Sequence, residues 1–213
     1  MTYFEIRECT DPACHLRMPI EPEINCGYFC PRCGAPMTLV EPAFQNLAPE
    51  QPLRVPRRRC MVILDNLRSA YNVGSIFRTA DGVGVKHIYL CGISPTPATN
   101  SRLAKTALNA ERTTAWTSIP NALTLVKDLK KRDYHLLALE RTPQSIEIDQ
   151  YRLDPADQRM IALIVGNERA GVDPGILRVC DAVLSLPMAG DKGSLNVAVA
   201  FGAAVYGLLW MQG

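Results

Sequence analysis

From residue 60 onward, short strand-like apolar runs alternate with helical patterns. The expected strands are Cys60–Leu64, Lys86–Cys91, Thr114–Trp116, His135–Leu139, Met160–Val165 and Ala182–Leu186. The expected helices between them are Val73–Asp81, Ser101–Leu108, Asn121–Lys131, Pro174–Val179 and Leu195–Trp210. This alternation predicts an α/β domain in which helices cover both faces of a mostly parallel sheet. Because ligands of such sheets bind beyond the carboxyl ends of the strands, the loops that follow the strands are the candidate site.

Five of the eight cysteines of this 213-residue chain lie within the first 33 residues. Four of them form two short-spaced pairs, Cys9 with Cys14 and Cys30 with Cys33. The N-terminus does not resemble a secretory signal, so we expect a cytoplasmic protein, in which clustered cysteines indicate metal before disulfides. The spacing predicts one tetrahedral zinc site, with iron as the alternative metal. Cys26 is left over and His15 is a possible substitute ligand; the alternative is reduced cysteines without a metal.

Composition predicts three parts: a metal ribbon at residues 1–37, a proline-rich basic linker at 38–59 and the α/β domain at 60–213. The first part has too few apolar runs to build a core without a metal. The net charge of +2 allows a polyanionic partner but does not by itself indicate one. The longest uncharged apolar run, Val197–Met211, is too short to span a membrane, so we expect no membrane association.

The first candidate loop runs from Asn72 to Arg78, just after the first strand of the α/β domain. On a helix, Arg78 falls on the same side as Gly74, four residues earlier. A guanidinium beside bare backbone suits a phosphate or a ribose, and Asn72 is expected to cap the helix. The alternative is a capped helix that carries a solvated arginine.

Two more loops follow the strands that end near Val165 and Leu186. In the second candidate loop, after Val165, Gly166 and Gly171 permit a tight turn and Glu168 places a carboxylate at the edge of the sheet. In the third candidate loop, after Leu186, Ser194 or Asn196 can cap the last helix. Taken singly, each is explained as an ordinary loop or helix start. Neither a P-loop nor a dinucleotide-binding fingerprint is present in the sequence.

In this order and spacing, the loops resemble the three motifs of the SpoU (TrmH) family of RNA 2′-O-methyltransferases, in the SPOUT superfamily. The matching residues are Asn72, Gly74 and Arg78; Gly166, Asn167, Glu168 and Gly171; and Leu186 to Ala198. The segment Lys105–Glu111 with Trp116 also resembles the family, although Asn109 stands where glycine is expected. The resemblance covers about residues 60–213, and the ribbon is similar to the zinc ribbons that precede some members.

The resemblance implies a trefoil-knotted fold, a homodimer whose interface includes the apolar last helix, and an RNA substrate, either tRNA or rRNA. It also implies that three loops enclose S-adenosylmethionine. The residues expected at this cofactor are Leu139, Glu140, Gly166, Asn167, Gly171, Leu186, Met188, Leu195 and Asn196.

Family precedent makes Arg78 the central catalytic residue. A guanidinium stays protonated in proteins, so we expect Arg78 to bind a phosphate or stabilise the developing 2′-oxyanion rather than act as a base. Asn72, Glu168, Ser194 and Asn196 are expected to orient it and the ribose. The alternative from a different class is a non-catalytic protein that binds RNA or another protein. A nucleotide-dependent enzyme acting on small molecules is disfavoured because the phosphate fingerprints are missing.

Overall fold

The structure, a computed structural model, describes residues 3–23, 28–45 and 54–211. The chain divides into two compact units, Met1–Leu53 and Arg54–Gly213. Each unit is described by itself below.

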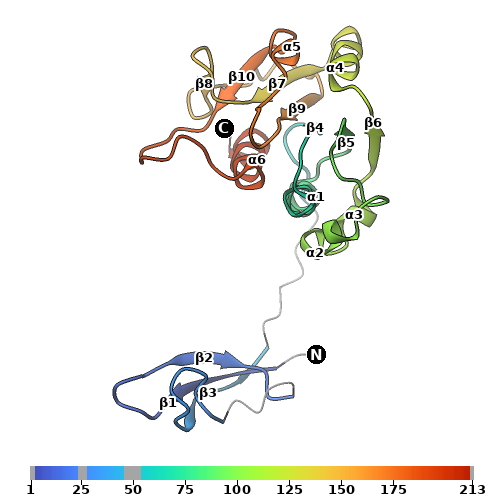
Figure 1. The fold of residues 1–213 in the computed structure, drawn as a ribbon. Helices are drawn as coiled ribbons and strands as arrows, with labels where there is room; N and C mark the ends of the chain where they lie inside the picture. The colour runs from blue at the N-terminus through green and yellow to red at the C-terminus, as the bar shows by residue number, and fades with distance from the viewer. Residues whose placement is uncertain (1–2, 24–27, 46–53, 212–213) are drawn as a thin grey trace. The chain divides into compact units, whose positions relative to one another are not determined.

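The front unit is a small antiparallel sheet with the strand order β2-β1-β3 (Figure 1). Its strands are β1 (Phe4–Cys9), β2 (Arg17–Ile20) and β3 (Met37–Phe44). The buried apolar side chains of its described part are Cys9, Ile20, Cys30 and Met37. Half of the buried residues in this described core are cysteines, so the cysteines supply much of its packing.

The prediction of a linker at residues 38–59 is wrong for the described residues at each end of this range. Strand β3 occupies residues 37–44 and pairs with β1. Pro42 lies at a shift in the β1–β3 register, which β3 tolerates because it is an edge strand; composition alone could not separate this strand from a linker. At the other end, Arg58 donates hydrogen bonds to the carbonyls of Asp154 and Asp157, which fixes the basic run to the second unit.

The second unit contains a seven-stranded sheet with the order β6-β5-β4-β9-β7-β10-β8, in which every pairing of the described strands is parallel. The strands are β4 (Cys60–Asp65), β5 (Ile88–Cys91), β6 (Trp116–Ile119), β7 (His135–Leu139), β8 (Ile146–Glu147), β9 (Ile161–Val165) and β10 (Ala182–Ser185). The predicted α/β class is therefore confirmed. β8 was not predicted, and β6 begins where the predicted strand ended because Thr114 caps the helix before it.

Helices cover both faces of this sheet. They are α1 (Ala70–Val83), η1 (Ser101–Leu103), α2 (Ala104–Ala107), α3 (Ala110–Thr113), α4 (Ala122–Lys131), α5 (Pro174–Leu177), α6 (Val197–Tyr206) and the π-helical turn η2 (Gly207–Met211). Helices α1 and α6 pack on one face, and α4 and α5 on the other (Figure 1). We call the core under α1 and α6 the first core and the core under α4 and α5 the second core. Along β4, Val62 and Leu64 enter the first core, while Met61 and Ile63 enter the second core. Among the described helices, none combines the length and apolarity needed to cross a membrane.

Helix α1 begins one turn earlier than predicted. Its N-cap is Ser69, whose hydroxyl accepts a hydrogen bond from the backbone N–H of Asn72. Asn72 therefore lies in the first turn of α1, and the prediction that it caps the helix is wrong. Ser69 is an equally good capping residue, so sequence alone could not choose between the two. The correction leaves the Asn72 side chain available to the site described below.

Gly74 does not offer the bare backbone patch that the sequence suggested for a phosphate or ribose. The segment η1–α2 covers it: a Cβ on Gly74 would lie 2.2 Å from the Thr106 hydroxyl oxygen and 2.3 Å from the Leu103 carbonyl oxygen. Glycine is needed here because two helical segments approach closely. The prediction of a ligand seat at Gly74 is therefore wrong.

Gly74→Ala is expected to lower the free energy of unfolding by about 1–3 kcal/mol, because the Leu103 backbone must move to admit the methyl group. Gly82→Ala, in the same helix, is the matched control. Its new Cβ would meet only the Tyr206 hydroxyl at 3.7 Å, so a gain of about 0.5–1 kcal/mol is expected. Urea denaturation of both variants measures the difference, and equal stabilities would contradict this packing.

Asn109 explains how the chain departs from the family pattern without losing the turn. Its φ of +73° lies in the left-handed region, where glycine is the usual residue and asparagine is the best-tolerated alternative. Asn109 therefore adopts, between α2 and α3, a backbone conformation that glycine also readily adopts.

Candidate active site

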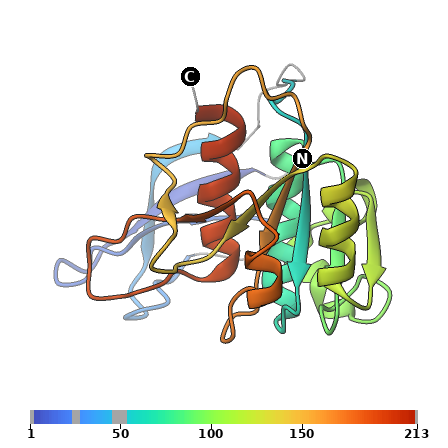
Figure 2. The ribbon, with the colours of Figure 1, turned by 90° about the horizontal axis from the view of Figure 1, so that it is seen from above.

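A cavity of about 480 Å³ lies at the carboxyl ends of β7, β9 and β10. Loops from three separate parts of the chain line it, together with Asn72 of α1. One of these loops is the long connection from β10 to α6, which swings away from the sheet before α6 begins (Figure 2). The volume falls within the range of about 300–1,000 Å³ that is typical of small-molecule sites.

All nine residues expected at the cofactor line this cavity. They are Leu139, Glu140, Gly166, Asn167, Gly171, Leu186, Met188, Leu195 and Asn196. Of the five expected catalytic residues, four line it as well: Asn72, Glu168, Ser194 and Asn196. Their placement at one edge of the sheet agrees with the sequence analysis, while the role of each residue stays a prediction.

Side-chain hydrogen bonds link all three motifs. The Glu168 carboxylate accepts from the backbone N–H groups of Arg68 and Ser69 at 2.9 and 3.0 Å. It also accepts from the Asn72 side-chain amide at 2.9 Å. The Asn72 side-chain oxygen in turn accepts from the Asn196 amide at 3.1 Å. Glu168, Asn72 and Asn196 thus form one chain of contacts, which we call the motif network.

The environment of Glu168 favours its charged form. Partial burial raises the pKa of this carboxyl, but the hydrogen bonds from Arg68, Asn72 and Ser69 outweigh burial and hold the pKa below its ordinary value. The carboxylate also lies at the N-terminus of the 14-residue helix α1, where the helix dipole stabilises negative charge. Glu168 is therefore an anion that orders the start of α1 and orients Asn72.

The second candidate loop, Gly166 to Gly171, is folded so tightly that both of these glycines are required. A Cβ on Gly166 would lie 2.3 Å from the backbone carbon of Gly171, and a Cβ on Gly171 would lie 2.4 Å from Glu140 Oε2. Glu140 itself accepts from the Val172 and Arg141 backbone N–H groups, both at 2.9 Å. The end of β7 is thus fastened to the second loop by Glu140, a role that sequence reasoning did not assign.

In the third loop, Asn196 caps α6 by accepting from the Ala198 backbone N–H at 2.9 Å. This resolves the choice between Ser194 and Asn196 that the sequence left open. Arg141 crosses to this loop and donates to the Gly193 carbonyl at 3.0 Å. Both Arg141 and Arg169 line the cavity but were not singled out from the sequence, although Arg141 follows the predicted cofactor residue Glu140 and Arg169 follows the predicted catalytic residue Glu168.

Arg78 is exposed on α1 and does not line the cavity of its own chain. It lies six positions after Asn72, which corresponds to about 9 Å along a helix and about 120° around it. The same helical periodicity that places Asn72 at the cavity therefore points Arg78 elsewhere. Arg78 can act on a ligand in this cavity only if the ligand or another chain extends toward it.

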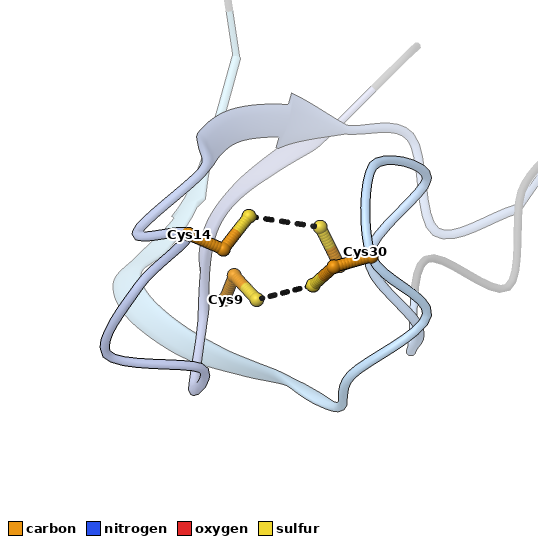
Figure 3. Close-up of side chains that lie close together, drawn as sticks. Cys9, Cys14 and Cys30 are labelled. Atoms are coloured by element: carbon orange, nitrogen blue, oxygen red, sulfur yellow. Dashed lines mark hydrogen bonds between the residues drawn. The ribbon is translucent and has the colours of Figure 1, made fainter.

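The four predicted metal ligands come together in the front unit. The sulfur atoms of Cys9, Cys14, Cys30 and Cys33 all lie within 4.8 Å of one another. The sulfur atoms of Cys14 and Cys30 are 3.8 Å apart (Figure 3), and those of Cys9 and Cys33 are 3.4 Å apart. Four sulfurs about 2.3 Å from a tetrahedral zinc would be about 3.8 Å apart, so the arrangement fits this metal.

The two other candidate ligands of the front unit have different outcomes. His15 is not part of the sulfur cluster; its Nδ1 lies 3.6 Å from a carboxylate oxygen of Glu8. Cys26 lies outside the described residues. The four-cysteine set is therefore the one that the geometry favours.

Comparison with known proteins gives consistent matches to the second unit. Residues 59–206 match the family model described as the SpoU rRNA Methylase family. The 23S rRNA (guanosine-2′-O-)-methyltransferase RlmB of Ralstonia nicotianae is 30% identical over 146 residues, covering 68% of this chain and 56% of that protein. The tRNA (guanosine(18)-2′-O)-methyltransferase of Aquifex aeolicus is 28% identical, covering 68% of this chain and 66% of that protein.

Solved structures agree with these matches. The AdoMet-bound rRNA methyltransferase from Sinorhizobium meliloti has a TM-score of 0.63 at 25% identity, covering 70% of this chain and 55% of that one. The A. aeolicus TrmH/SpoU tRNA modifying enzyme has a TM-score of 0.61 at 27% identity, covering 71% of this chain and 75% of that one. The chain spans only 56–60% of the length of several RlmB relatives. It nevertheless belongs to the SpoU rRNA methylase family.

Proposed function

We propose that this chain transfers a methyl group from S-adenosylmethionine to a ribose 2′-hydroxyl of RNA. The observation that carries the proposal is the motif network, which joins Asn72, Glu168 and Asn196 beside one cavity at the strand ends. Relatives named as 2′-O-methyltransferases of rRNA and tRNA support the same chemistry. The printed names divide between the two RNA classes, so both are candidate substrates.

The cavity fits the proposed cofactor in size and in the character of its walls. Two glycine positions keep the second loop close-packed, and the loop's backbone borders the cavity beside Leu139, Leu186 and Met188. Apolar walls with a few placed polar groups are typical of small-molecule sites. When bound, S-adenosylmethionine supplies a methyl group on a positively charged sulfur, which an oxygen can attack in line.

The residues of the chain then have to align the ribose and stabilise its oxygen. As the oxygen–methyl bond forms and the methyl–sulfur bond breaks, the 2′-hydroxyl loses its proton to solvent or to a nearby proton acceptor. In this proposal the Asn72 amide, held by Glu168, and the Asn196 amide, held by Asn72, orient the ribose by hydrogen bonds. Holding the reacting groups in line is the main requirement for such a displacement.

We further propose that the enzyme is a homodimer and that Arg78 acts in a site completed by the second copy. Helix α6 exposes an apolar face, with Val199 58% and Tyr206 42% exposed. Helix α6 packs on α1 beside Thr79, the residue after Arg78, so a second copy that covers this face would lie near Arg78. Mixing Arg78→Ala with a variant whose cofactor cavity is blocked tests this arrangement. Activity regained in the mixture would support a site shared between two chains. A wild-type chain that sediments as a monomer would contradict it.

The front unit is proposed to bind one zinc ion through Cys9, Cys14, Cys30 and Cys33. Methyl transfer to a hydroxyl needs no metal, so the ion would have a structural role. The knotted path implied by the family resemblance is likewise a prediction for the segment from β7 to α6.

Methyl transfer to RNA tests the proposed function directly. Total RNA from a strain lacking the gene would be incubated with the full chain and a labelled methyl donor. We expect label in alkali-resistant dinucleotides, the signature of a 2′-O-methylated ribose, at one position of rRNA or tRNA. Label on a base, or no transfer to either RNA class, would contradict the proposal.

A further inference from the structure

Three exposed cations and one exposed aromatic side chain gather over α1 and η1–α2, outside the cavity. Tyr71 is 47% exposed, and Arg78, Arg102 and Lys105 are exposed. Across the part of the chain that the structure describes, no hydrogen bond or ion pair engages the three cationic side chains. We call these four residues the basic track.

The elements place the track beside the cavity. Tyr71 and Arg78 are seven residues apart on α1, so they share a helix face and lie about 10 Å apart along it. Helix α2 lies against the same turn, because the Thr106 hydroxyl donates to the Tyr71 carbonyl at 2.9 Å. Lys105 directly precedes this contact residue. Asn72, the residue after Tyr71, lines the cavity and lies about 100° around the helix from it, so the track occupies the helix face next to the cavity.

The track has one sign of charge. Asp81 is the nearby exposed acid on α1, and its carboxylate accepts a hydrogen bond from the Thr113 hydroxyl at 2.8 Å. The Glu111 side chain, on α3, is only 9% exposed. Cationic side chains without acidic partners, next to an exposed aromatic ring, are typical of a nucleic-acid-binding surface.

The charge distribution of the whole chain points the same way. The front unit, Met1–Leu53, contains three basic and seven acidic residues, so 20 of the 23 basic residues belong to the second unit. A four-thiolate zinc site would add further negative charge to the front unit. The front unit is therefore poorly suited to a phosphate backbone, and the second unit must supply that surface.

We propose that Tyr71, Arg102 and Lys105 bind an unpaired segment of the substrate RNA as it enters the cavity. This inference rests on the proposed function and names the surface that delivers its substrate. Arg102 and Lys105 contact phosphates, and Tyr71 stacks on a base. Stacking of this kind requires an unpaired nucleotide, so the segment is a single strand or a loop rather than a continuous duplex.

Binding of a short single-stranded RNA of mixed sequence, followed by fluorescence anisotropy over a series of salt concentrations, tests the phosphate contacts. For Arg102→Ala/Lys105→Ala, the slope of log affinity against log salt is expected to fall by about 1.4, or about 0.7 per cation, with about a tenfold loss of affinity at 0.1 M salt. The matched control is Lys127→Ala/Lys131→Ala, which removes two exposed charges from α4 on the opposite face of the sheet. This control is expected to retain the wild-type slope.

The aromatic contact is tested separately. Tyr71→Ala is expected to weaken binding of the same RNA several-fold, whereas Tyr71→Phe keeps the ring and should bind like the wild type. Affinity for S-adenosylmethionine is expected to be unchanged in every one of these variants, because none of the substituted residues lines the cavity.

Equal losses in the two double variants would show an effect of net charge alone and would overturn the basic track. Unchanged RNA affinity in Arg102→Ala/Lys105→Ala would overturn it too, and would leave a protein partner as the reading of this surface. The proposed function fails on a different result, the absence of methyl transfer by the wild-type chain. If RNA binding still depended on Arg102 and Lys105 in that case, the track would stand without the activity.

Discussion

Cys30→Ala is expected to release the metal of the front unit and unfold its sheet while Arg54–Gly213 stays folded. The described core of the front unit is only Cys9, Ile20, Cys30 and Met37, and the first and third of these are proposed ligands. Structural zinc sites contribute about 10–16 kcal/mol of apparent binding free energy at neutral pH, which such a core cannot replace. Zinc content by atomic absorption and amide hydrogen exchange in the full chain measure the two effects.

Cys180→Ala is the matched control for this prediction. Burial raises the pKa of the Cys180 thiol to about 12, and this residue packs against the second core, away from any cysteine cluster of the described residues. It should retain one zinc per chain and wild-type protection of β1 to β3. A Cys30→Ala protein with unchanged exchange in those strands would refute a structural role for the metal.

Glu168→Ala is expected to reduce methyl transfer by about 100-fold or more. The substitution removes three hydrogen bonds that join the second loop to Asn72 and to the start of α1. A displacement of about 1 Å among reacting groups can cost about 100-fold in rate, and the lost capping interaction should cost only about 0.5–2 kcal/mol of stability. Single-turnover rates at saturating cofactor, together with urea denaturation, separate the two effects.

Glu168→Gln distinguishes charge from hydrogen bonding at the same position. Its amide oxygen can still accept the two bonds that Ser69 and Asn72 donate to Oε1, so we expect an intermediate rate. Because the folded pKa of Glu168 is depressed, its contribution to stability should be present above the ordinary carboxyl pKa and be lost as pH falls through the depressed value. Wild-type rates in Glu168→Ala would mean that the motif network has no part in the reaction.

The strands of the second unit were predictable because five of them are runs of apolar residues buried on both faces of a parallel sheet. β7, for example, occupies the predicted His135–Leu139. Elements without that signal were missed. β8 has only two residues at the edge of the sheet, and β3 is almost wholly exposed. The start of α1 was misplaced because Ser69 and Asn72 are both good capping residues.

The location of the site could be predicted from the sequence for a similar reason. Parallel strands place their carboxyl ends at one edge, so residues after β7, β9 and β10 could be expected to gather, and they do. What a residue contacts could not be inferred from sequence spacing. Glu140 fastens a loop, and Gly74 admits a neighbouring helix instead of a ligand. Arg141 and Arg169 lacked any periodic signal that would separate them from solvated arginines.

Calorimetric titration of S-adenosylmethionine into the wild-type chain and Ala200→Phe tests the central claim most directly. Ala200, on α6, lines the cavity without belonging to the motif network, so the larger side chain fills the space and leaves the network in place. The account predicts one binding event per wild-type chain and none for Ala200→Phe at unchanged thermal stability. Equal affinity in the two proteins would show that the donor binds elsewhere and would contradict the account.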